Sequence, residues 1–414
     1  MEVMNKAKLA KGASRKLATL SSAKKNGGLE AMAQALEDNI PDLIAENCLD
    51  VNLAEENGRP KALIDRLILN EDRIKAMAEG LRVIKDLPDP VGEVISQWKR
   101  PNGLEVGQQR VPLGVVAIIY ESRPNVTADA IGLCLKTGNS VVLRGSSEAI
   151  HSNIAIVKVM IEAAYKAGIP EGCIQLIEDT RRESVQELVK LSGLIDVVIP
   201  RGGAGLIKVV VENASVPVIE TGVGNCHIYV DGECDVDMAI NIAINAKVQR
   251  PGVCNAAETL LVDQNVASEI LPRLIKQLQD QNVEVRGCER TLKISPGVLP
   301  ASQEDWSTEY LDYIIAIKIV DGVDSAIDHI NAYGSGHSEA IVTSNYFNAE
   351  KFLEYVDAAA VYANASTRFT DGFEFGFGAE LGISTQKLHA RGPMGLKELT
   401  AIKYIVRGKG QIRQ

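Results

Sequence analysis

The stretch 115–143, VVAIIYESRPNVTADAIGLCLKTGNSVVL, decides the fold class. It contains two short apolar runs, at 115–119 and 140–143, with a helical pattern over residues 126–136 between them. Short apolar runs are typical of strands that are buried on both faces of a sheet, and a helix between two such strands connects them in parallel. The stretch therefore predicts a unit of two parallel strands joined by a helix.

The same alternation continues toward the C-terminus and predicts a doubly wound parallel sheet with five such units. Further helices are expected at 147–167, 182–191 and 204–213, and further strands at 174–177, 197–199 and 216–219. The helix from Ser147 should pack on the sheet through one apolar face. That face consists of Ile150, Ile154, Val157, Ile161 and Ala164.

A second alternating block runs from Ile228 to about Val361 and predicts a second α/β domain. Its expected strands are 259–262, 314–319, 340–342 and 358–362.

The two ends of the chain differ from these blocks. Residues 1–86 predict helices, with interruptions at Gly27-Gly28, Pro41 and Gly58-Arg59-Pro60. A hairpin that turns at Asn102-Gly103 should project and mediate assembly. The last strand, Lys403–Arg407, can pair with this hairpin in its own chain or in a neighbouring subunit.

The composition excludes several classes of protein. The 414 residues carry a formal net charge of −10, which argues against nucleic-acid binding because that needs a basic face. Seven scattered cysteines without a CxxC pair suggest neither a disulfide framework nor a metal site. No apolar window has the length of a membrane span. We therefore expect a soluble protein without a targeting segment, in the reducing cytoplasm.

Cys254 is the candidate nucleophile. It follows a turn at Pro251-Gly252, between a helix that begins near Asp235 and an apolar strand. Lys247 and Arg250 lie close in sequence, so a thiolate here can be stabilised and can attack an electrophile. The alternative interpretation is a small buried hydrophobic residue.

Three predicted strand ends carry polar or glycine-rich segments, which is where open parallel sheets bind ligands. They are Arg144-Gly-Ser-Ser147, Pro200-Arg-Gly-Gly-Ala-Gly205 and Glu220-Thr-Gly-Val-Gly-Asn225. The second opens a helix and can offer backbone N–H groups to a phosphate. The dinucleotide fingerprint GxGxxG with a downstream acidic residue is missing, so these residues alone leave the ligand open.

The motifs resemble, in sequence and order, those of the aldehyde dehydrogenase superfamily. This resemblance rests on Pro112-Leu-Gly-Val-Val-Ala117, Leu135-Lys-Thr-Gly-Asn-Ser-Val-Val-Leu143, Glu220-Thr-Gly222 and the Cys254 loop. Within the superfamily, nearly the whole chain is similar to the gamma-glutamyl phosphate reductase family. That similarity rests on Glu121-Ser-Arg-Pro-Asn125, Gly224-Asn-Cys-His227, Gln249-Arg-Pro-Gly-Val-Cys254-Asn255 and Leu388-His-Ala-Arg-Gly-Pro393.

The resemblance implies an aldehyde dehydrogenase-like α/β fold, with two doubly wound α/β domains and a small β oligomerisation flap. Residues 1–91 and 111–222 would form the NADPH-binding domain, and residues 223–395 the catalytic domain. Residues 92–110 and 396–414 would form the strands of the flap.

The resemblance also implies the chemistry. Cys254 would attack the acyl carbon of L-glutamyl 5-phosphate and expel phosphate, and the resulting thioester would be reduced with NADPH to release glutamate 5-semialdehyde, in proline biosynthesis. Asn125 and the Cys254 backbone N–H would stabilise the oxyanion. Glu220 matches the residue that activates water in oxidising members, but this reaction needs no water. Proton transfer, tuning of Cys254, or a plain surface carboxylate therefore stay open for Glu220.

For the cofactor, the resemblance implies NADPH held by residues at the strand ends. Ser147 stands where NAD-preferring members carry a glutamate that binds the ribose, and Arg144 and Ser146 add donors for a 2′-phosphate, although Glu148 opposes one. The other implied cofactor residues are Gly145, Gly202 and Gly203 near the phosphates and Glu309 at the nicotinamide ribose.

For the substrate, the resemblance and the need for cationic and hydroxyl groups favour Ser366, Thr367 and Arg368. Arg123 and Arg250 are lesser candidates, and His337 stays open between a structural and a catalytic role. Glutamate 5-kinase is the implied functional partner, and a homo-oligomer is expected. Two rival classes are an aldehyde oxidiser that uses Glu220 and water, and a non-catalytic relative that keeps the fold.

Overall fold

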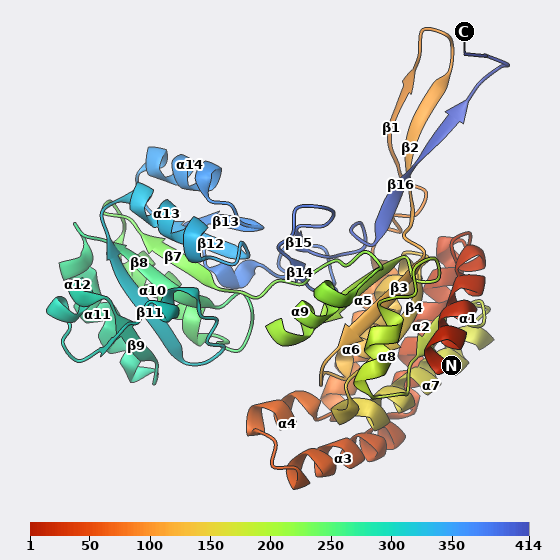
Figure 1. The fold of residues 1–414 in the computed structure, drawn as a ribbon, viewed down its shortest axis with the longest axis horizontal. Helices are drawn as coiled ribbons and strands as arrows, with labels where there is room; N and C mark the ends of the chain where they lie inside the picture. Colours follow the sequence, from red (N-terminus) through yellow and green to blue (C-terminus); the bar gives the residue numbers. More distant parts are fainter. Residues whose placement is uncertain (414) are drawn as a thin grey trace. The chain divides into compact units, whose positions relative to one another are not determined.

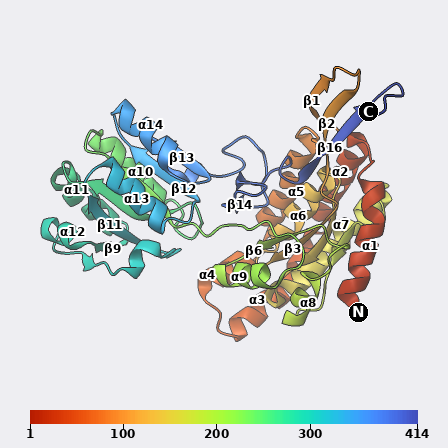
Figure 2. The ribbon, with the colours of Figure 1, turned by 45° about the horizontal axis from the view of Figure 1, so that its top comes forward.

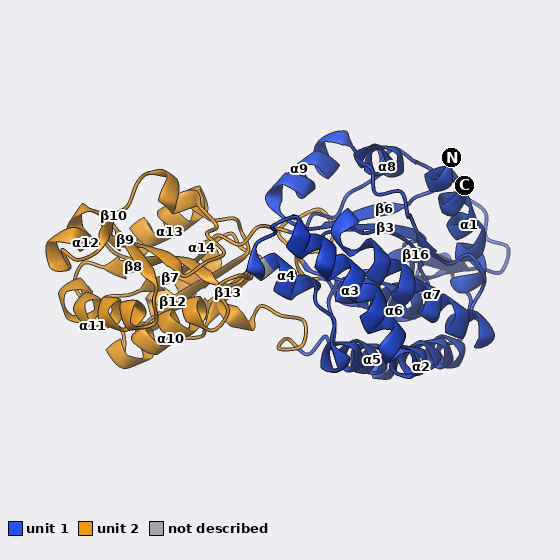
Figure 3. Ribbon diagram, turned by 90° about the horizontal axis from the view of Figure 1, so that it is seen from below, with its two compact units in different colours: residues 1–221, 376–382, 394–414 blue, residues 222–375, 383–393 orange. Residues whose placement is uncertain are grey.

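The computed structural model describes residues 1–413, and the chain divides into two compact units (Figure 3). Unit 1 comprises Met1–Thr221, Gly376–Gly382 and the chain from Met394 onward. Unit 2 comprises Gly222–Phe375 and Ile383–Pro393. Residues 376–382, which the sequence assigned to the second domain, therefore group with unit 1. The cofactor-binding and catalytic roles of the two domains stay predictions.

The core of unit 1 is a parallel sheet of strand order β5-β4-β3-β6. The predicted strand, helix and strand of residues 115–143 are confirmed, as β3, α6 and β4. Helices cover both faces of the sheet, with α1, α8 and α9 on one face and α6 and α7 on the other (Figure 1). The strands are β3 (Val115–Tyr120), β4 (Ser140–Arg144), β5 (Ile174–Leu176) and β6 (Val197–Arg201), and the helices between and after them are α6 (Asn125–Lys136), α7 (Ile150–Lys166), α8 (Arg182–Leu188) and α9 (Ala204–Asn213).

The predicted strand at 216–219 is wrong, because this segment makes only an isolated bridge between Val218 and Val198. Pro217 has no N–H to donate, and the N–H groups of Ser215 and Val216 bond to the carbonyl of Val189 instead. The described sheet of unit 1 therefore has four strands and not five.

The predicted apolar face of α7 is also partly wrong. Ile154 is exposed, while Ser152 and Asn153 are fully buried. The Ser152 hydroxyl donates to Asp50 at 2.5 Å, and the Asn153 side-chain oxygen accepts from Thr127 at 2.9 Å. Because these polar side chains are buried, the face of α7 that packs on the sheet differs from the face that apolar spacing alone predicts.

The helical N-terminal segment is confirmed, except that Gly27-Gly28 lies inside α2 and does not interrupt it. A side chain at Gly28 would lie 2.7 Å from Cγ1 of Ile169, so glycine allows α2 to approach the turn after α7. The helices of this segment are α1 (Glu2–Leu17), α2 (Ser22–Asp38), α3 (Ile40–Glu56), α4 (Lys61–Leu67) and α5 (Glu71–Asp86).

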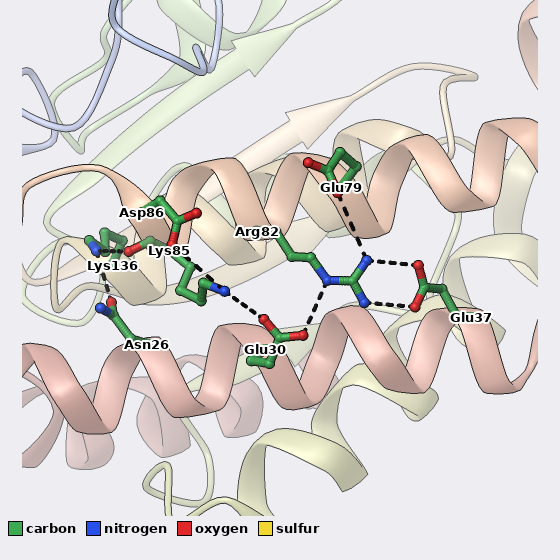
Figure 4. Close-up of polar contacts among 8 residues, drawn as sticks. All are labelled: Asn26, Glu30, Glu37, Glu79, Arg82, Lys85, Asp86 and Lys136. Carbon is green, nitrogen blue, oxygen red and sulfur yellow. Dashed lines mark hydrogen bonds and ion pairs between the residues drawn. The ribbon is translucent and has the colours of Figure 1, made fainter.

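A polar network holds α2 against α5 (Figure 4). Arg82 of α5 donates to both oxygens of Glu37 at 2.7 Å and to Glu30 at 3.1 Å, and Lys85 donates to the other oxygen of Glu30 at 2.8 Å. The bidentate pairing with Glu37 fixes the relative rotation of the two helices as well as their distance.

The flap is an antiparallel sheet of order β1-β2-β16 that projects from unit 1 (Figures 1 and 2). β1 (Val94–Lys99) and β2 (Glu105–Pro112) form the predicted hairpin, with Gly103 at φ +87° in the turn. β16 (Thr400–Arg407) pairs with β2 of its own chain, which decides between the two predicted pairings. Trp98 and Tyr404 lie exposed on this sheet with ring centroids 6.5 Å apart.

Unit 2 is built on a parallel sheet of order β10-β9-β11-β8-β7-β12-β13, and the predicted second α/β domain is confirmed. α10, α11 and α12 cover one face, while α13 and α14 cover the other. The strands are β7 (Cys226–Val230), β8 (Ala257–Asp263), β9 (Glu284–Gly287), β10 (Leu299–Pro300), β11 (Ile314–Val320), β12 (Ser338–Val342) and β13 (Ala360–Ala363), and the helices are α10 (Val236–Val248), α11 (Ala267–Asp280), α12 (Glu289–Ile294), α13 (Val323–Tyr333) and α14 (Tyr346–Tyr355).

One pair of short strands and single turns of 3-10 helix complete the described elements. β14 (Ile383–Ser384) pairs with β15 (Gly392–Pro393). The 3-10 turns are η1 (Ser147–Ala149), η2 (Glu304–Ser307) and η3 (Thr367–Phe369). None of the helices within residues 1–413 combines the length and the apolar character that crossing a bilayer requires.

The neighbouring glycines of α2 give a stability test. Gly27 faces open space, so Gly27→Ala should raise the free energy of unfolding by roughly 0.5–1 kcal/mol through helix propensity. Gly28→Ala should be less stable than Gly27→Ala by about 1–3 kcal/mol, because its methyl group would overlap Ile169. Thermal unfolding of both variants beside the wild type measures this, and equal melting temperatures for the two variants would contradict the close packing of α2.

Candidate active site

Cys254 lies where the sequence predicts it, in the loop between α10 and β8. Asp235 caps α10 by accepting the N–H of Met238 at 2.9 Å, and Pro251 lies beyond the last turn of the helix. The Cys254 side chain is half-buried, unlike Cys134 and Cys226, which are fully buried. A thiol at this position can be reached by a small molecule.

Lys247 is fully buried and pairs with Glu258 at 2.5 Å, and its predicted effect on the thiol stays a prediction. The last turn of α10 directs Lys247 inward, and Glu258 faces it from the start of β8. Burial raises the pKa of Glu258 to about 7, against the opposing effect of the Lys247 charge. The Arg368 guanidinium interacts electrostatically with both Cys254 and the exposed Arg250.

The carbonyl of Cys254 is enclosed by the start of β7. A side chain at Gly224 would place Cβ 1.4 Å from the Cys254 oxygen, so only glycine fits there. The Cys226 thiol donates to the same oxygen at 3.1 Å. These contacts fix the backbone of the nucleophile without using its thiol.

The residue after the nucleophile, Asn255, is held by the segment that was predicted to bind substrate. Thr367 is fully buried and donates its hydroxyl to the Asn255 carbonyl at 2.7 Å. Arg368 donates to the Asn255 side chain and, at 2.8 Å, to Gln249. Ser366 accepts the N–H of Arg368 and caps η3. Thr367 thus positions the loop, while Arg368 also brings a positive charge to Cys254.

Glu309 lies in the same unit as Cys254 and accepts the N–H of Gly224 at 2.7 Å. Glu309 therefore contacts the backbone that encloses the nucleophile, a link that the sequence did not indicate. Its predicted contact with a nicotinamide ribose stays a prediction.

Two family motifs meet beside this loop in a buried polar cluster. His227 bonds through Nδ1 to Glu339 at 3.0 Å, and both side chains are fully buried. Burial raises the pKa of the Glu339 carboxyl. Glu339 and Arg391 also line a cavity of about 480 Å³ in unit 2, where Arg391 pairs with Asp357 at 2.8 Å. His337 is buried and bonds to Ser338 at 2.8 Å, which leaves its role open.

In unit 1, the segment after β3 carries Arg123 and Asn125. Both side chains are exposed, and Asn125 begins α6 and donates to Asp129 at 3.2 Å. Burial raises the pKa of Asp129 to about 6, although the Asn125 bond opposes the shift. Asp129 thereby orients the amide that is predicted to stabilise an oxyanion.

Arg144, at the end of β4, is mostly occupied by the protein itself. Its guanidinium donates to the carbonyls of Gly145, Thr180 and Arg181 and to the Ser184 hydroxyl. Arg144 thus shapes the segment after β4 and retains little capacity for a phosphate.

Glu148 is neutralised by a residue that the sequence reasoning missed. Arg59 pairs with Glu148 at 2.8 Å and is itself half-exposed. Ser122 donates to the same carboxylate and lies 3.1 Å from the Ser146 hydroxyl, while Ser147 begins η1. Arg59 is distant in sequence from these serines, so no local pattern could have indicated it.

The glycine-rich loop after β6 already binds a carboxylate. Gly203 donates its N–H to Glu121 at 3.1 Å, and a side chain at Gly202 would overlap Glu121. Gly203 and Gly205 face open space at their Cβ positions, which lets a ligand approach the backbone closely. A pyrophosphate here would take the position of the Glu121 carboxylate.

Glu220 is half-buried in unit 1, one residue before Thr221, whose hydroxyl donates to the Pro200 carbonyl at 2.7 Å. The predicted site residues therefore fall into two groups. Unit 1 holds Arg123, Asn125, Arg144–Ser147, Gly202, Gly203 and Glu220, and unit 2 holds Arg250, Cys254, Glu309 and Ser366–Arg368. Within residues 1–413, no group of three His, Cys, Asp or Glu side chains is arranged to bind a metal ion.

Comparison with known proteins identifies the family. Residues 1–312 match the aldehyde dehydrogenase family. The chain is 61% identical over 414 residues to a gamma-glutamyl phosphate reductase of Caldanaerobacter subterraneus subsp. tengcongensis, covering 100% of both proteins. It belongs to the gamma-glutamyl phosphate reductases. The crystal structure of the gamma-glutamyl phosphate reductase of Thermotoga maritima, at 51% identity, superimposes with a TM-score of 0.98 over 100% of both chains.

An engineered glycolyl-CoA reductase with bound NADP⁺ shares the fold at 16% identity, with a TM-score of 0.70 over 98% of this chain and 96% of its own. The predictions of an aldehyde dehydrogenase-like fold and of a gamma-glutamyl phosphate reductase are thus confirmed. Membership of the family indicates a nicotinamide cofactor. The roles of the individual site residues stay predictions.

Gly224→Ala tests the enclosure of the nucleophile. Because the new methyl group would overlap the Cys254 carbonyl, the loop must shift, and a displacement of roughly 1 Å should lower turnover about 100-fold. Turnover and the rate of Cys254 alkylation by iodoacetamide are the measurements. Gly297→Ala is the matched control, since Gly297 lies in the same unit and faces open space. Unchanged alkylation and turnover in Gly224→Ala would refute the contact.

Proposed function

We propose that this chain reduces L-glutamyl 5-phosphate to L-glutamate 5-semialdehyde with NADPH and releases phosphate, through a thioester on Cys254. The observation that carries the proposal is the Cys254 loop, in which backbone and flanking residues are held while the thiol stays half-buried, in a chain of this family. The reaction supplies a step of proline biosynthesis.

The first step forms a bond between the Cys254 sulfur and the acyl carbon and breaks the bond from that carbon to the phosphate oxygen. Phosphate leaves with the electron pair and needs little acid assistance. The positive charge of Arg368, which interacts with Cys254 and with Arg250, favours both the thiolate and an anionic substrate. Asn125 is the proposed side-chain donor to the oxyanion, together with the Cys254 N–H.

In the second step, a bound nicotinamide would supply the hydride to the thioester carbon, and the carbonyl oxygen would take up a proton to give a thiohemiacetal. Collapse of the thiohemiacetal breaks the bond between carbon and sulfur, returns the electron pair to Cys254 and releases the hydroxyl proton. No water is consumed, so Glu220 is not needed as a hydrolytic base. We assign Glu220 to this proton or to the tuning of Cys254.

The strand ends of unit 1 fit a nicotinamide dinucleotide. Gly203 and Gly205 leave room for close approach to the backbone, and the Gly203 N–H already bonds to a carboxylate. Glu309 is the proposed ligand of the nicotinamide ribose. The proposed ligands of a 2′-phosphate are Ser146, Ser147 and Arg59. Arg59 also neutralises Glu148, which would otherwise repel the phosphate. These residues, more than Arg144, support NADPH over NADH.

We also propose a cytoplasmic homo-oligomer that is coupled functionally to glutamate 5-kinase, which makes the acyl phosphate. The exposed flap supports self-association, because β1 and β16 leave strand edges open and carry exposed apolar side chains. These side chains are Val94, Ile95, Trp98, Ile402, Tyr404 and Val406.

The central test is the reverse reaction, which avoids the labile acyl phosphate. Glutamate 5-semialdehyde should reduce NADP⁺ only in the presence of phosphate, and Cys254→Ala should abolish this activity because no thioester can form. Absorbance of NADPH at saturating phosphate and without phosphate is the measurement. NADPH formation without phosphate would instead indicate a hydrolytic aldehyde oxidiser, and its absence under all conditions would indicate a non-catalytic relative.

Arg59→Gln tests the cofactor preference. Loss of the Arg59 charge leaves Glu148 to repel a 2′-phosphate, so the ratio of kcat/KM for NADP⁺ to that for NAD⁺ should fall roughly 10-fold, as expected for one charge-assisted contact. Arg290→Gln is the matched control, because Arg290 is a partly exposed arginine paired with Asp321 at 2.7 Å in unit 2. A ratio that stays the same in Arg59→Gln excludes Arg59 from recognition of the phosphate.

A further inference from the structure

Lys247 and Glu258 form a fully buried ion pair that joins the two ends of the nucleophile loop. Lys247 lies in the last turn of α10, before the loop, and Glu258 lies at the start of β8, after the loop. Cys254 lies between them in sequence. Lys247 Nζ lies 2.5 Å from Oε2 of Glu258, and neither side chain is exposed to solvent. The pair therefore sets the separation of the two points from which the loop departs.

Stability alone does not explain this pair. Burial of two charges costs several kcal/mol per ion, and an apolar pair of similar volume often stabilises a protein equally well. The second oxygen of Glu258 shows what the carboxylate adds, because Oε1 accepts the N–H of Leu311 at 3.2 Å. Lys247 holds one oxygen of the carboxylate, and the other oxygen fastens a distant segment.

The fastened segment is irregular and is otherwise held by side chains, because the Tyr310 hydroxyl donates to Asp305 at 2.6 Å and the Thr308 hydroxyl donates to the Glu304 carbonyl at 2.7 Å. Residues 308–311 lie between η2 and β11 without regular secondary structure, and Leu311 adopts φ +54°, a left-handed conformation that is costly for leucine. A backbone in this state persists only where other contacts hold it. The bond to Glu258 supplies such a contact at Leu311 itself.

The same segment leads back to the nucleophile. Glu309, two residues before Leu311, accepts the N–H of Gly224, and Gly224 packs against the carbonyl of Cys254. The contacts form a closed circuit that begins at Glu258, next to the C-terminal end of the Cys254 loop. It passes through Leu311 and Glu309 to Gly224 and returns to the loop at the Cys254 carbonyl. Each contact of the circuit lies within unit 2.

We propose that Glu258 is a positioning residue that locks the Cys254 loop and the Glu309 segment into one rigid piece, with Lys247 holding its carboxylate in place. The inference rests on the proposed function, since it assigns Cys254 as nucleophile and Glu309 as cofactor ligand. Reduction requires the thioester carbon and the hydride donor to be aligned, and the circuit fixes the two protein segments on which this alignment depends.

Two double variants isolate the role of the carboxylate. Lys247→Met/Glu258→Gln removes both charges but keeps a side-chain oxygen for the Leu311 N–H. Lys247→Met/Glu258→Met removes the charges and the oxygen. We expect the Gln variant to keep kcat within about 5-fold of the wild type, and the Met variant to lose about 100-fold in kcat with KM for phosphate within about 2-fold. The assay is the phosphate-dependent reduction of NADP⁺.

Cys254 alkylation by iodoacetamide gives a second readout that needs no catalysis. Its rate should change at least about 5-fold in the Met variant and little in the Gln variant. The control is Lys25→Met, which breaks the buried Lys25–Asp89 pair in unit 1, also 2.5 Å long, and should lower the melting temperature without a comparable loss of kcat.

Equal kcat and equal alkylation rates in the two double variants would overturn the proposal, as would an equal loss of kcat in Lys25→Met. If the wild type shows no phosphate-dependent activity, the proposed function fails, and the alkylation rates still decide the positioning role. If the Met variant does not fold, amide hydrogen exchange of the wild type decides. The Leu311 amide must then be protected, and rapid exchange at Leu311 rejects the proposal.

Discussion

The site of this reductase depends on the contact of one backbone with another, at Gly224 and Cys254. The Cys254 carbonyl occupies the space that any side chain at position 224 would fill. The next residue, Asn225, then donates to the carbonyls of Trp306 at 2.8 Å and Tyr333 at 2.9 Å. The start of β7 thus joins the nucleophile loop to two other loops of unit 2. A single excluded methyl group accounts for the glycine that begins the motif Gly224-Asn-Cys-His227.

Periodicity and motif order predicted most of the fold, because strands buried on both faces and amphipathic helices leave strong local patterns. The prediction of a strand at 216–219 was wrong, because Pro217 has no N–H to donate. The predicted face of α7 was partly wrong, because Ser152 and Asn153 are buried against polar partners. The outcome also depends on partners far away in sequence, which are Val189 for the first segment and Asp50 and Thr127 for α7. The short strands β9 and β10 were missed because they carry no continuous apolar run.

The candidate site could be predicted by residue type but not by contact. The sequence placed Cys254, Arg368 and Glu309 correctly in one domain, yet it assigned Lys247 to the thiol and Thr367 to the substrate. Both side chains are fully buried, Lys247 against Glu258 and Thr367 against the Asn255 carbonyl, and their predicted roles stay predictions. Likewise, the sequence did not indicate the pairing of Arg59 with Glu148, because only the tertiary fold brings the two residues together. The role of a charged residue depends on its partner, and these partners lie too far away in sequence to be predicted from a local pattern.

Because β16 pairs with β2, the flap can be completed only late in synthesis of the chain. All of unit 2 is synthesised between these two strands, so the hairpin of β1 and β2 emerges from the ribosome long before its third strand exists. During that interval the edge of β2 is open to any strand nearby, including the hairpin of another nascent copy. The flap is therefore the last part of unit 1 that can close, and its three-stranded sheet distinguishes chains whose translation has passed unit 2 from those that stopped earlier.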